Sequence, residues 1–377
     1  MRDSSARDHA ELDSPNPSEA LLQWRETRDA DRYRQWCLDT FEGYVRVGEH
    51  EFHPAEVLLR LKPDVVDKTI AECKTQLLEQ DEETVCSQFP SPIAIPYQQA
   101  IHGPRDPNRR LTRMRDTWEG LINFLSAMVV AEAKVVGVGT SPVQVIEATS
   151  RRSIRHRDLR SDKLSIRIGM IEGILESWRS AGVRAVLADL IPVGLPAELR
   201  RLNSVRNGFS HLGTLSDVQA ARLVEENRPI LRDVLVDCLF LAETQLVRLI
   251  RVTPGSPPSA EIESLNGHSN ARRVRDLDLD ADAQMVIMQC GKVGSFDRVL
   301  AKMRSRYLDL SPYFYACDDD SGHHTRIAFF KKRAADMCHL EVVGESLALT
   351  SEANLHASEF VRCEVAVIGS PGGIGDE

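Results

Sequence analysis

The residues with the clearest chemical potential lie near the middle of the chain, in the segment RRLNSVRNGFSHLG at 201–214. Arg206, Asn207 and His211 stand close together there, at the end of an otherwise apolar helical stretch. A histidine with a pKa near neutrality can remove a proton from a ribose 2′-hydroxyl or deliver one to a leaving oxygen. The planar guanidinium of arginine fits the extra negative charge on a pentavalent phosphorus. These residue types therefore fit a phosphodiester-cleaving site that needs no metal.

The spacing within this segment decides how the side chains can meet. On a helix, Asn207 and His211 share one face because they are four residues apart, and Arg206 reaches across the helix end. His211 falls in the predicted last turn, where the negative end of the helix dipole favours its protonated form. Gly208 and Ser210 each lower helix stability by roughly 0.5–1 kcal/mol relative to alanine. Their small size lets another helix or a ligand come close.

The same residues also have a purely structural interpretation. Arg206 could pair with a surface carboxylate, and His211 could cap the carbonyl groups of its own helix. Residue types alone do not separate this interpretation from the catalytic one. The surrounding elements help to separate the two.

The segment lies within a predicted bundle of helices over 86–252. The motif helix has Pro196 near its first position and ends before Gly213, the usual asymmetry of helix termini. A strongly apolar helix is predicted over 216–252, with a kink or break at Pro229. A long amphipathic helix precedes the motif, and its apolar residues recur at every third or fourth position. These residues are Leu111, Met114, Trp118, Leu121, Ile122, Leu125 and Met128.

The chain on either side of this bundle has a different composition. Short β-branched and aromatic runs near the C-terminus predict strands; they are AQMVIMQCG, TRIAFFKK, CHLEVVG, SLALT and EFVRCEVAVIG. One helix is predicted among them at 295–306. The predicted fold class is α+β and multidomain, with an all-α helical-bundle core followed by a small β-rich C-terminal domain. The predicted parts are a disordered N-terminus at 1–18, a helical segment at 19–85, the bundle at 86–252, a linker at 253–271, the β-rich domain at 272–370 and a tail at 371–377.

Composition excludes several classes of protein. The formal net charge of −9 opposes sequence-blind coating of nucleic acid, because the field of the whole molecule repels phosphates. No apolar run approaches the ~20 residues that a membrane span needs. The polar N-terminus lacks the apolar core of a secretory signal. We therefore expect a cytoplasmic protein that does not contact membranes and keeps its cysteines as free thiols.

Positive charge is concentrated in two segments despite the acidic balance. Segment 104–115 holds five arginines, and segment 151–167 holds seven Lys or Arg together with His156. Such patches on an acidic body fit a specific phosphate-containing ligand, although solvated helix faces have the same composition. The candidate RNA-binding residues in them are Arg109, Arg110, Arg113, Arg151, Arg152 and Arg155.

A metal site is a separate alternative. The chain places Cys317, His323, His324, Cys338 and His339 within one short stretch. Zinc sites need converging ligands that usually come from closely spaced cysteine pairs, and this stretch has no such pair. We expect no metal or other cofactor. A metal-dependent enzyme that uses Cys317, His323 and Cys338 stays an alternative.

The stretch VRNGFSHLG resembles the signature of HEPN domains, in which an arginine precedes a histidine by a few positions. Asn207 occupies the place of the polar residue that commonly follows the arginine. The resemblance covers about 89–252, where an apolar helix precedes the motif, a glycine follows it and a long closing helix comes next. The segments FPSPIAIPYQQA and WEGLINFL also resemble parts of bacterial HEPN-containing proteins.

The resemblance implies metal-independent RNA cleavage by a homodimer whose two motif copies face each other. Arg206 and His211 would carry the attack of the 2′-hydroxyl, which leaves a 2′,3′-cyclic phosphate, and Asn207 would orient His211 or hold a phosphate oxygen. Some family members have an acidic residue on an earlier helix near the site. The sequence leaves open whether Glu119, Glu172 or neither fills that place.

The family also implies a biological setting, which is that of bacterial toxins and phage-defence effectors. An inhibitor or sensor partner would act through the β-rich C-terminal domain, because an unrestrained ribonuclease harms its host. The alternative is a non-catalytic HEPN-like nucleotide-binding module or assembly scaffold. Substitution of the motif residues separates the two, since only the enzyme would lose RNA cleavage.

Overall fold

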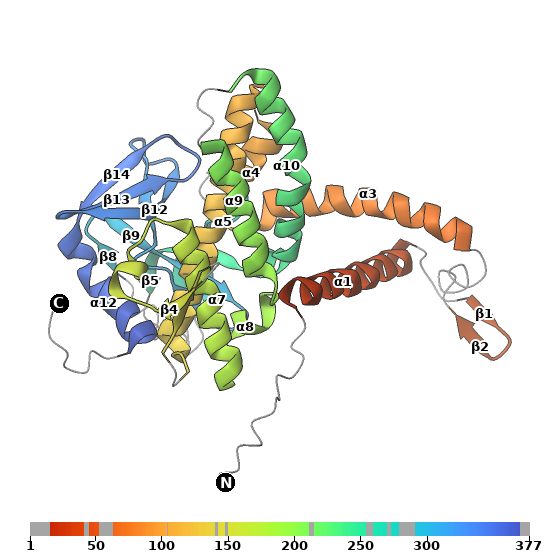
Figure 1. Ribbon diagram of the computed structural model, residues 1–377, viewed down its shortest axis with the longest axis horizontal. Coiled ribbons are helices and arrows are strands. Elements are labelled where there is room, and N and C mark those ends of the chain that lie inside the picture. The colour runs from red at the N-terminus through yellow and green to blue at the C-terminus, as the bar shows by residue number, and fades with distance from the viewer. Residues whose placement is uncertain are drawn as a thin grey trace, which may run out of the picture. The chain divides into compact units, whose positions relative to one another are not determined.

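The computed structural model describes residues 16–40, 45–52, 63–103, 105–139, 142–147, 150–210, 215–253, 259–269, 273–278 and 291–369 (Figure 1). The chain divides into two compact units. One comprises residues 1–78 with 192–197, and the other comprises 79–191 with 198–377.

The first unit contains mostly helix. Helix α1 spans Pro17–Thr40, and helix α3 spans Pro63–Gln88 and continues into the second unit. The Lys74 ammonium lies 5.6 Å from the centroid of the Tyr33 ring, which joins the two helices. Between them a hairpin of β1 (Val45–Val47) and β2 (His50–Phe52) was not predicted, because strands of three residues carry no readable period. Of the predicted disordered N-terminus, residues 1–15 lie outside the described residues.

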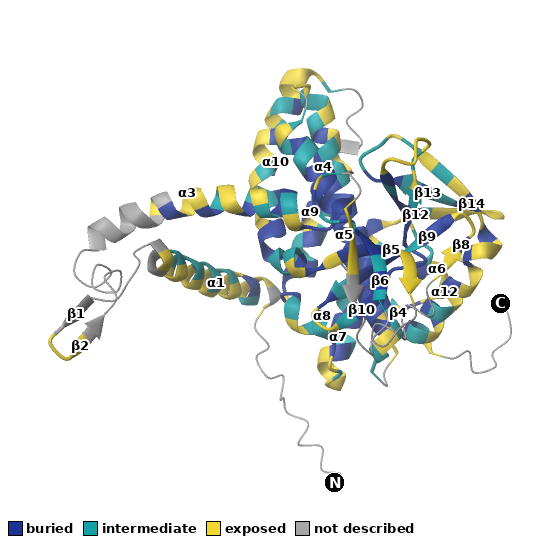
Figure 2. Cartoon of the chain, turned by 180° about the vertical axis from the view of Figure 1, so that it is seen from behind, coloured by how far each residue is buried: buried dark blue, intermediate teal, exposed yellow. Residues whose placement is uncertain are grey.

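The second unit is built around helix α5 (Pro107–Val136), which packs against helices on several sides and against the sheet. Asp106 caps its start by accepting the backbone N–H groups of Asn108 and Arg109. Every residue from Thr117 to Ala133 is buried, so the middle of α5 is enclosed all round rather than amphipathic (Figure 2). The other elements before the sheet are α4 (Ser91–His102), β3 (Gln144–Ile146), β4 (Arg151–Ser153), α6 (His156–Leu159), α7 (Leu164–Ala181), α8 (Val186–Leu190), α9 (Leu195–Ser210), α10 (Asp217–Asp237) and the 3₁₀ turn Leu239–Glu243.

The C-terminal region of this unit is a curled antiparallel half-barrel. Its main path runs β14-β13-β12-β11-β9-β5-β6-β7, and β8 and β10 both pair with β9. The strands are β5 (Gln245–Thr253), β6 (Ser259–Ser264), β7 (Val274–Asp278), β8 (Lys292–Val293), β9 (Phe296–Met303), β10 (Arg306–Asp309), β11 (Phe314–Asp318), β12 (Thr325–Ala334), β13 (Met337–Val342) and β14 (Ala348–Glu352), followed by helix α12 (Ala353–Ile368).

Helices and sheet share one apolar core. The ring of Phe124 on α5 meets the ring of Phe314 on β11 edge to face, with centroids 5.7 Å apart. Phe330 on β12 and Phe360 on α12 form a similar pair at 5.1 Å. Because α5 and α12 also pack on each other, the half-barrel and the helices are held together by the same buried side chains.

Two segments that were predicted as helices are strands. The predicted helix over 216–252 ends at Asp237, and β5 takes the last part of it. The predicted helix at 295–306 is wrong, because Phe296–Met303 forms β9. Short apolar runs fit both periods, and the hydrogen-bonded neighbours decide between them. Here β5 lies between β9 and β6, and β9 lies between β11 and β5.

The opposite error occurs at the C-terminus. EFVRCEVAVIG, predicted as a strand, lies mostly in α12, where His356, Phe360, Cys363 and Val367 are buried at helical spacing. Part of the predicted linker is strand β6. Most of the run AQMVIMQCG, residues 283–290, lies outside the described residues, as do residues 370–377 and with them the predicted tail.

The described chain is thus a mixed helix-and-sheet protein, and the predicted β-rich C-terminal region is confirmed: TRIAFFKK lies in β12, and most of CHLEVVG and SLALT lies in β13 and β14. The all-α HEPN-like core and the domain boundaries stay predictions. Among the helices that the structure describes, none is both long and apolar enough to cross a lipid bilayer.

Candidate functional site

The motif arginine lies in the last turn of helix α9. Asn207 and Gly208 follow it on the exposed side of the same turn. A β-carbon built on Gly208 would meet nothing within 4 Å among the described residues, so none of these residues fills the space beside it. His211 follows one residue after the end of α9 and lies outside the described residues.

Arg206 is held by a buried carboxylate. Its Nε and Nη2 donate to Oε1 of Glu119 on α5 at 3.1 and 2.5 Å, and the Glu119 side chain is only 8% exposed. Its Nη1 donates to Oδ1 of Asn207 at 3.0 Å. Two side chains therefore orient the guanidinium, and such charge-assisted pairs are the strong class of hydrogen bond.

A second cation reaches the same carboxylate from the half-barrel. Lys331 Nζ on β12 donates to Glu119 Oε2 at 3.0 Å and lies 2.9 Å from Glu341 Oε2 on β13. Arg115 Nε lies 3.9 Å from Glu119 Oε1. Burial by itself would raise the pKa of Glu119, but Lys331 and Arg206 outweigh that effect and the pKa lies below its ordinary value. We call Arg206, Glu119, Lys331 and Arg115 the Glu119 cluster.

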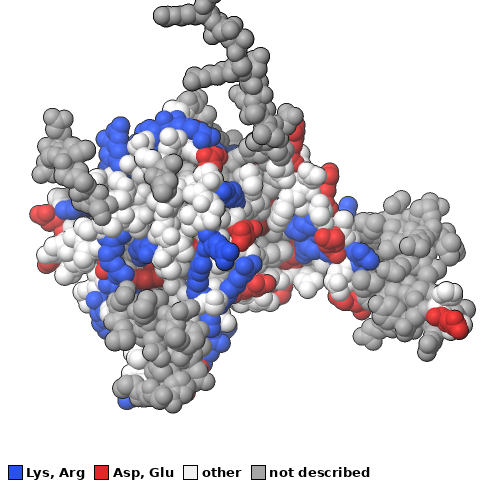
Figure 3. Space-filling view, turned by 90° about the horizontal axis from the view of Figure 1, so that it is seen from below, with Lys and Arg blue, Asp and Glu red and all other residues white. Residues whose placement is uncertain are grey.

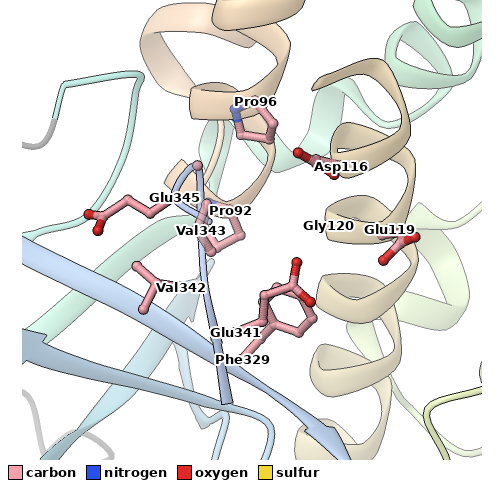
Figure 4. Close-up of a pocket in the computed structure, with 11 residues that line it drawn as sticks. Pro92, Pro96, Asp116, Glu119, Gly120, Phe329, Glu341, Val342, Val343 and Glu345 are labelled. Atoms are coloured by element: carbon pink, nitrogen blue, oxygen red, sulfur yellow. The ribbon is translucent and has the colours of Figure 1, made fainter. Parts of the chain in front are cut away.

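A small pocket lies beside this cluster, between α4, α5 and the β12–β13 strands (Figure 4). Helices α4 and α5 approach closely at Gly120, where a β-carbon would lie only 2.3 Å from the Pro92 carbonyl oxygen. Burial raises the pKa of Asp116, which also lines the pocket. The other lining residues are Pro96, Glu119, Phe329, Glu341, Val342, Val343, Gly344 and Glu345.

A wider cleft of about 780 Å³ adjoins the small pocket and shares Asp116, Glu341 and Glu345 with it. Two of the predicted RNA-binding residues, Arg109 and Arg113, line this cleft. They lie on α5, the helix that carries Glu119. The rest of the lining is Gln99, Asn108, Thr112, Arg115 and Ser346.

The remaining predicted RNA-binding residues are not in this cleft. Arg110 Nε donates to the carbonyl of Ala100 at 2.9 Å, which ties α5 to α4. The other three lie in or just after strand β4: Arg151, Arg152 and Arg155. Figure 3 shows one face of the molecule, on which basic side chains form separate groups with uncharged and acidic surface between them.

The β4 arginines make local contacts. Arg151 pairs with Glu176 on α7 at 2.9 Å, and Arg152 pairs with Asp158 at 2.5 Å. Arg155 donates its backbone N–H to Asp158 at 2.8 Å. The structure therefore gives Arg152 a structural partner and leaves its predicted RNA contact a prediction.

The sequence left open whether Glu119, Glu172 or neither lies near the motif. The structure places these two glutamates on different helices, and each binds a different arginine of α9. Glu119 binds Arg206, whereas Glu172 on α7 binds Arg200, which lies six residues earlier on α9. Sequence reasoning missed Lys331. Only its position at the register shift of β12 brings it to Glu119, and nothing in its local sequence signals that position.

The cysteines of the alternative metal site do not converge. In the sheet register, Cys317 of β11 lies opposite Arg326 of β12. Cys338 of β13 lies opposite Arg333, on the other edge of β12. Seven residues of strand separate these positions, which is roughly 23 Å at 3.3 Å per residue. Within the described part of the chain, no group of three or more His, Cys, Asp or Glu is placed to hold a metal ion.

No protein family, curated protein or solved structure matches this chain. The function must therefore be inferred from the residues and their geometry.

Proposed function

We propose that this protein is a metal-independent endoribonuclease of HEPN type that uses Arg206, Asn207 and His211. The observation that carries the proposal is the buried Glu119 carboxylate, which fixes the Arg206 guanidinium at the end of the helix that leads to His211. An arginine held in this way is oriented before a substrate binds, which lowers the reorganisation that the reaction needs.

The proposed reaction is an internal transesterification. His211 accepts the proton of the ribose 2′-hydroxyl, and the 2′-oxygen forms a bond to phosphorus as the bond to the 5′-oxygen breaks. The leaving 5′-oxygen takes a proton from a second acid or from water, and the products are a 2′,3′-cyclic phosphate and a 5′-hydroxyl. Arg206 stabilises the charge on the phosphoryl oxygens, and Asn207 orients the neighbouring groups.

The space beside Gly208, which no described residue fills, supports a site at this helix end. A glycine within a helix lowers stability by about 1 kcal/mol relative to alanine, and no described neighbour requires it here. A substrate backbone or a second copy of the chain would use that space. The wider cleft on α5 supports an RNA path, because Arg109 and Arg113 lie on the helix that carries Glu119.

The test is cleavage of a mixed RNA by the full chain in excess EDTA. Wild type should cut and leave 2′,3′-cyclic phosphate ends, and Arg206→Ala and His211→Ala should abolish cutting while folding and dimerisation persist. RNA with 2′-deoxyribose at the cut position should resist.

The chain offers two matched controls for these variants. His102 also ends a helix before a glycine, and Arg201 lies on α9 with an exposed side chain. His102→Ala and Arg201→Ala should cut like wild type. Cleavage by His211→Ala at the wild-type rate would overturn the proposal. A non-catalytic scaffold would cut in no variant and would change assembly when the motif is altered.

A further inference from the structure

The Glu119 carboxylate connects the motif helix with the half-barrel. Its two oxygens have different partners: Oε1 accepts from Arg206 on α9, and Oε2 accepts from Lys331 on β12. All three residues belong to the same compact unit. A side chain of the C-terminal sheet thus binds the group that orients the motif arginine.

We infer that Lys331 is a positioning residue for Arg206, acting through Glu119, and that it couples the C-terminal sheet to the candidate site. The inference rests on the proposed function for its catalytic consequence. The coupling itself rests only on the contacts of the three side chains.

The burial of the three groups explains why Lys331 matters. Glu119 is 8% exposed, whereas Lys331 and Arg206 are 34% and 26% exposed. Water therefore screens the carboxylate little, and its position follows its cations. Without the ammonium group, Oε2 would lose its partner, and the carboxylate would turn toward Arg206 and Arg115. The guanidinium would then move with it.

The backbone of β12 places Lys331 at this point. The pairing of β12 with β13 shifts between Phe330 and Lys332, so Lys331 is the extra residue of a bulge. A bulge bends its strand and redirects side chains. Here it allows the ammonium group to reach both Glu119 on α5 and Glu341 on β13.

A buried arginine fixes the strand just before the bulge. Arg167 of α7 is 2% exposed, and it donates to Asn123 Oδ1 at 2.5 Å and to the Phe330 carbonyl oxygen at 3.0 Å. Asn123 lies one turn after Glu119 on α5. The tie between α5 and β12 therefore keeps Lys331 in reach of Glu119, and a change in the sheet at this bulge would be transmitted to Arg206.

The first test compares Lys331→Met with Lys331→Arg in the full chain. Lys331→Met should lower kcat for RNA cleavage by about tenfold to a hundredfold and leave KM within about twofold, because a misplaced catalytic group loses transition-state contacts. Lys331→Arg keeps the positive charge and should recover most of the rate. Lys332→Met, the exposed neighbour on the same strand, is the matched control and should match wild type.

A second measurement does not depend on activity. The Nε–Hε resonance of Arg206, assigned with Arg206→Lys, should shift in Lys331→Met and stay in place in Lys332→Met. An unshifted resonance in Lys331→Met would overturn the coupling. If wild type cuts no RNA, the proposed function is wrong, but a shifted resonance would still support Lys331 as the positioning residue.

Discussion

Two buried ionic clusters in the second unit have opposite compositions. In the Glu119 cluster, one enclosed carboxylate faces cations from α5, α9 and β12. In the second cluster, the arrangement is reversed: Arg248 of β5 is enclosed and faces carboxylates of the sheet. Its guanidinium lies 2.5 Å from Asp297, 2.6 Å from Asp318 and 3.4 Å from Glu263.

The two clusters differ in the sign of the charged groups that they expose to solvent. Burial by itself would lower the pKa of Arg248, but Asp318 and Asp297 raise it well above the ordinary value. Its buried carboxylates are Glu263 and Asp297, at 1% and 11% exposure, whereas Asp318 is 44% exposed and reaches solvent. In the Glu119 cluster the groups that reach solvent are the cations, at 26% to 41% exposure. The Arg248 cluster thus presents a carboxylate to solvent, whereas the Glu119 cluster presents cations, which can also bind an anion.

Removal of the enclosed cation should produce the largest change in stability. Arg248→Met removes the guanidinium that lies between the buried carboxylates of Glu263 and Asp297, and we expect the free energy of unfolding to fall by about 3–5 kcal/mol. Urea denaturation measures it, with the exposed neighbour Arg251→Met as control. A loss as small as that of the control would show that the two clusters do not differ in this respect.

Removal of the enclosed carboxylate should have a smaller effect on stability. Glu119→Gln leaves cations that are partly solvated, so we expect a loss of about 1–3 kcal/mol. RNA cleavage should be lost as well, since Arg206 is no longer fixed. Denaturation and cleavage of the same preparation check both points, and full cleavage by this variant would contradict the orienting role of Glu119.

The pH dependence gives a further comparison, between two carboxylates on one turn of α5. The pKa of Glu119 is lowered, so its stabilisation is present above its ordinary value of 4.5 and is lost as pH falls through the lowered pKa. The pKa of Asp116 is raised, so its ionisation destabilises the fold as pH rises above 3.8.

Stability measured across this acidic range separates the two residues. The difference between Glu119→Gln and wild type should shrink as pH falls. Asp116→Asn should remove a slope of the opposite sign. Equal slopes in the two variants would refute the assignment of opposite pKa shifts.

The smallest change is expected at Gly208, near the end of α9. Gly208→Ala should stabilise the fold by about 0.5–1 kcal/mol, because alanine favours helix and the added methyl group meets no described neighbour. Thermal unfolding checks this. A gain in stability together with a loss of cleavage would show that a ligand or a second chain uses the space. An unchanged cleavage rate would argue against close approach at this residue.

Deletion of the C-terminal region would not be an informative test of its role. Strands β5 and β9 are hydrogen-bonded neighbours, and α12 packs on α5, so truncation removes part of the core around the Glu119 cluster. Single substitutions such as Lys331→Met leave that core in place.

Local patterns in the chain predicted what depends on near neighbours. Helix α9 up to Arg206, the long helix α5 and strands β12 to β14 follow from side-chain periodicity and end residues, which act within a turn or between alternate residues. The same patterns were ambiguous for β5, β9 and α12, because their apolar runs fit more than one period and pairing across the sheet decided the outcome.

The composition of the candidate site lies beyond such patterns. Arg206, Asn207 and His211 are adjacent in the chain and could be singled out from it, but Glu119 is 87 residues from Arg206 and Lys331 is 212 residues from Glu119. Whether a charged side chain is exposed or is paired with a buried group depends on which helices and strands pack together. Only the tertiary structure, with α5 enclosed between α9 and the β12 bulge, brings these charges into one cluster.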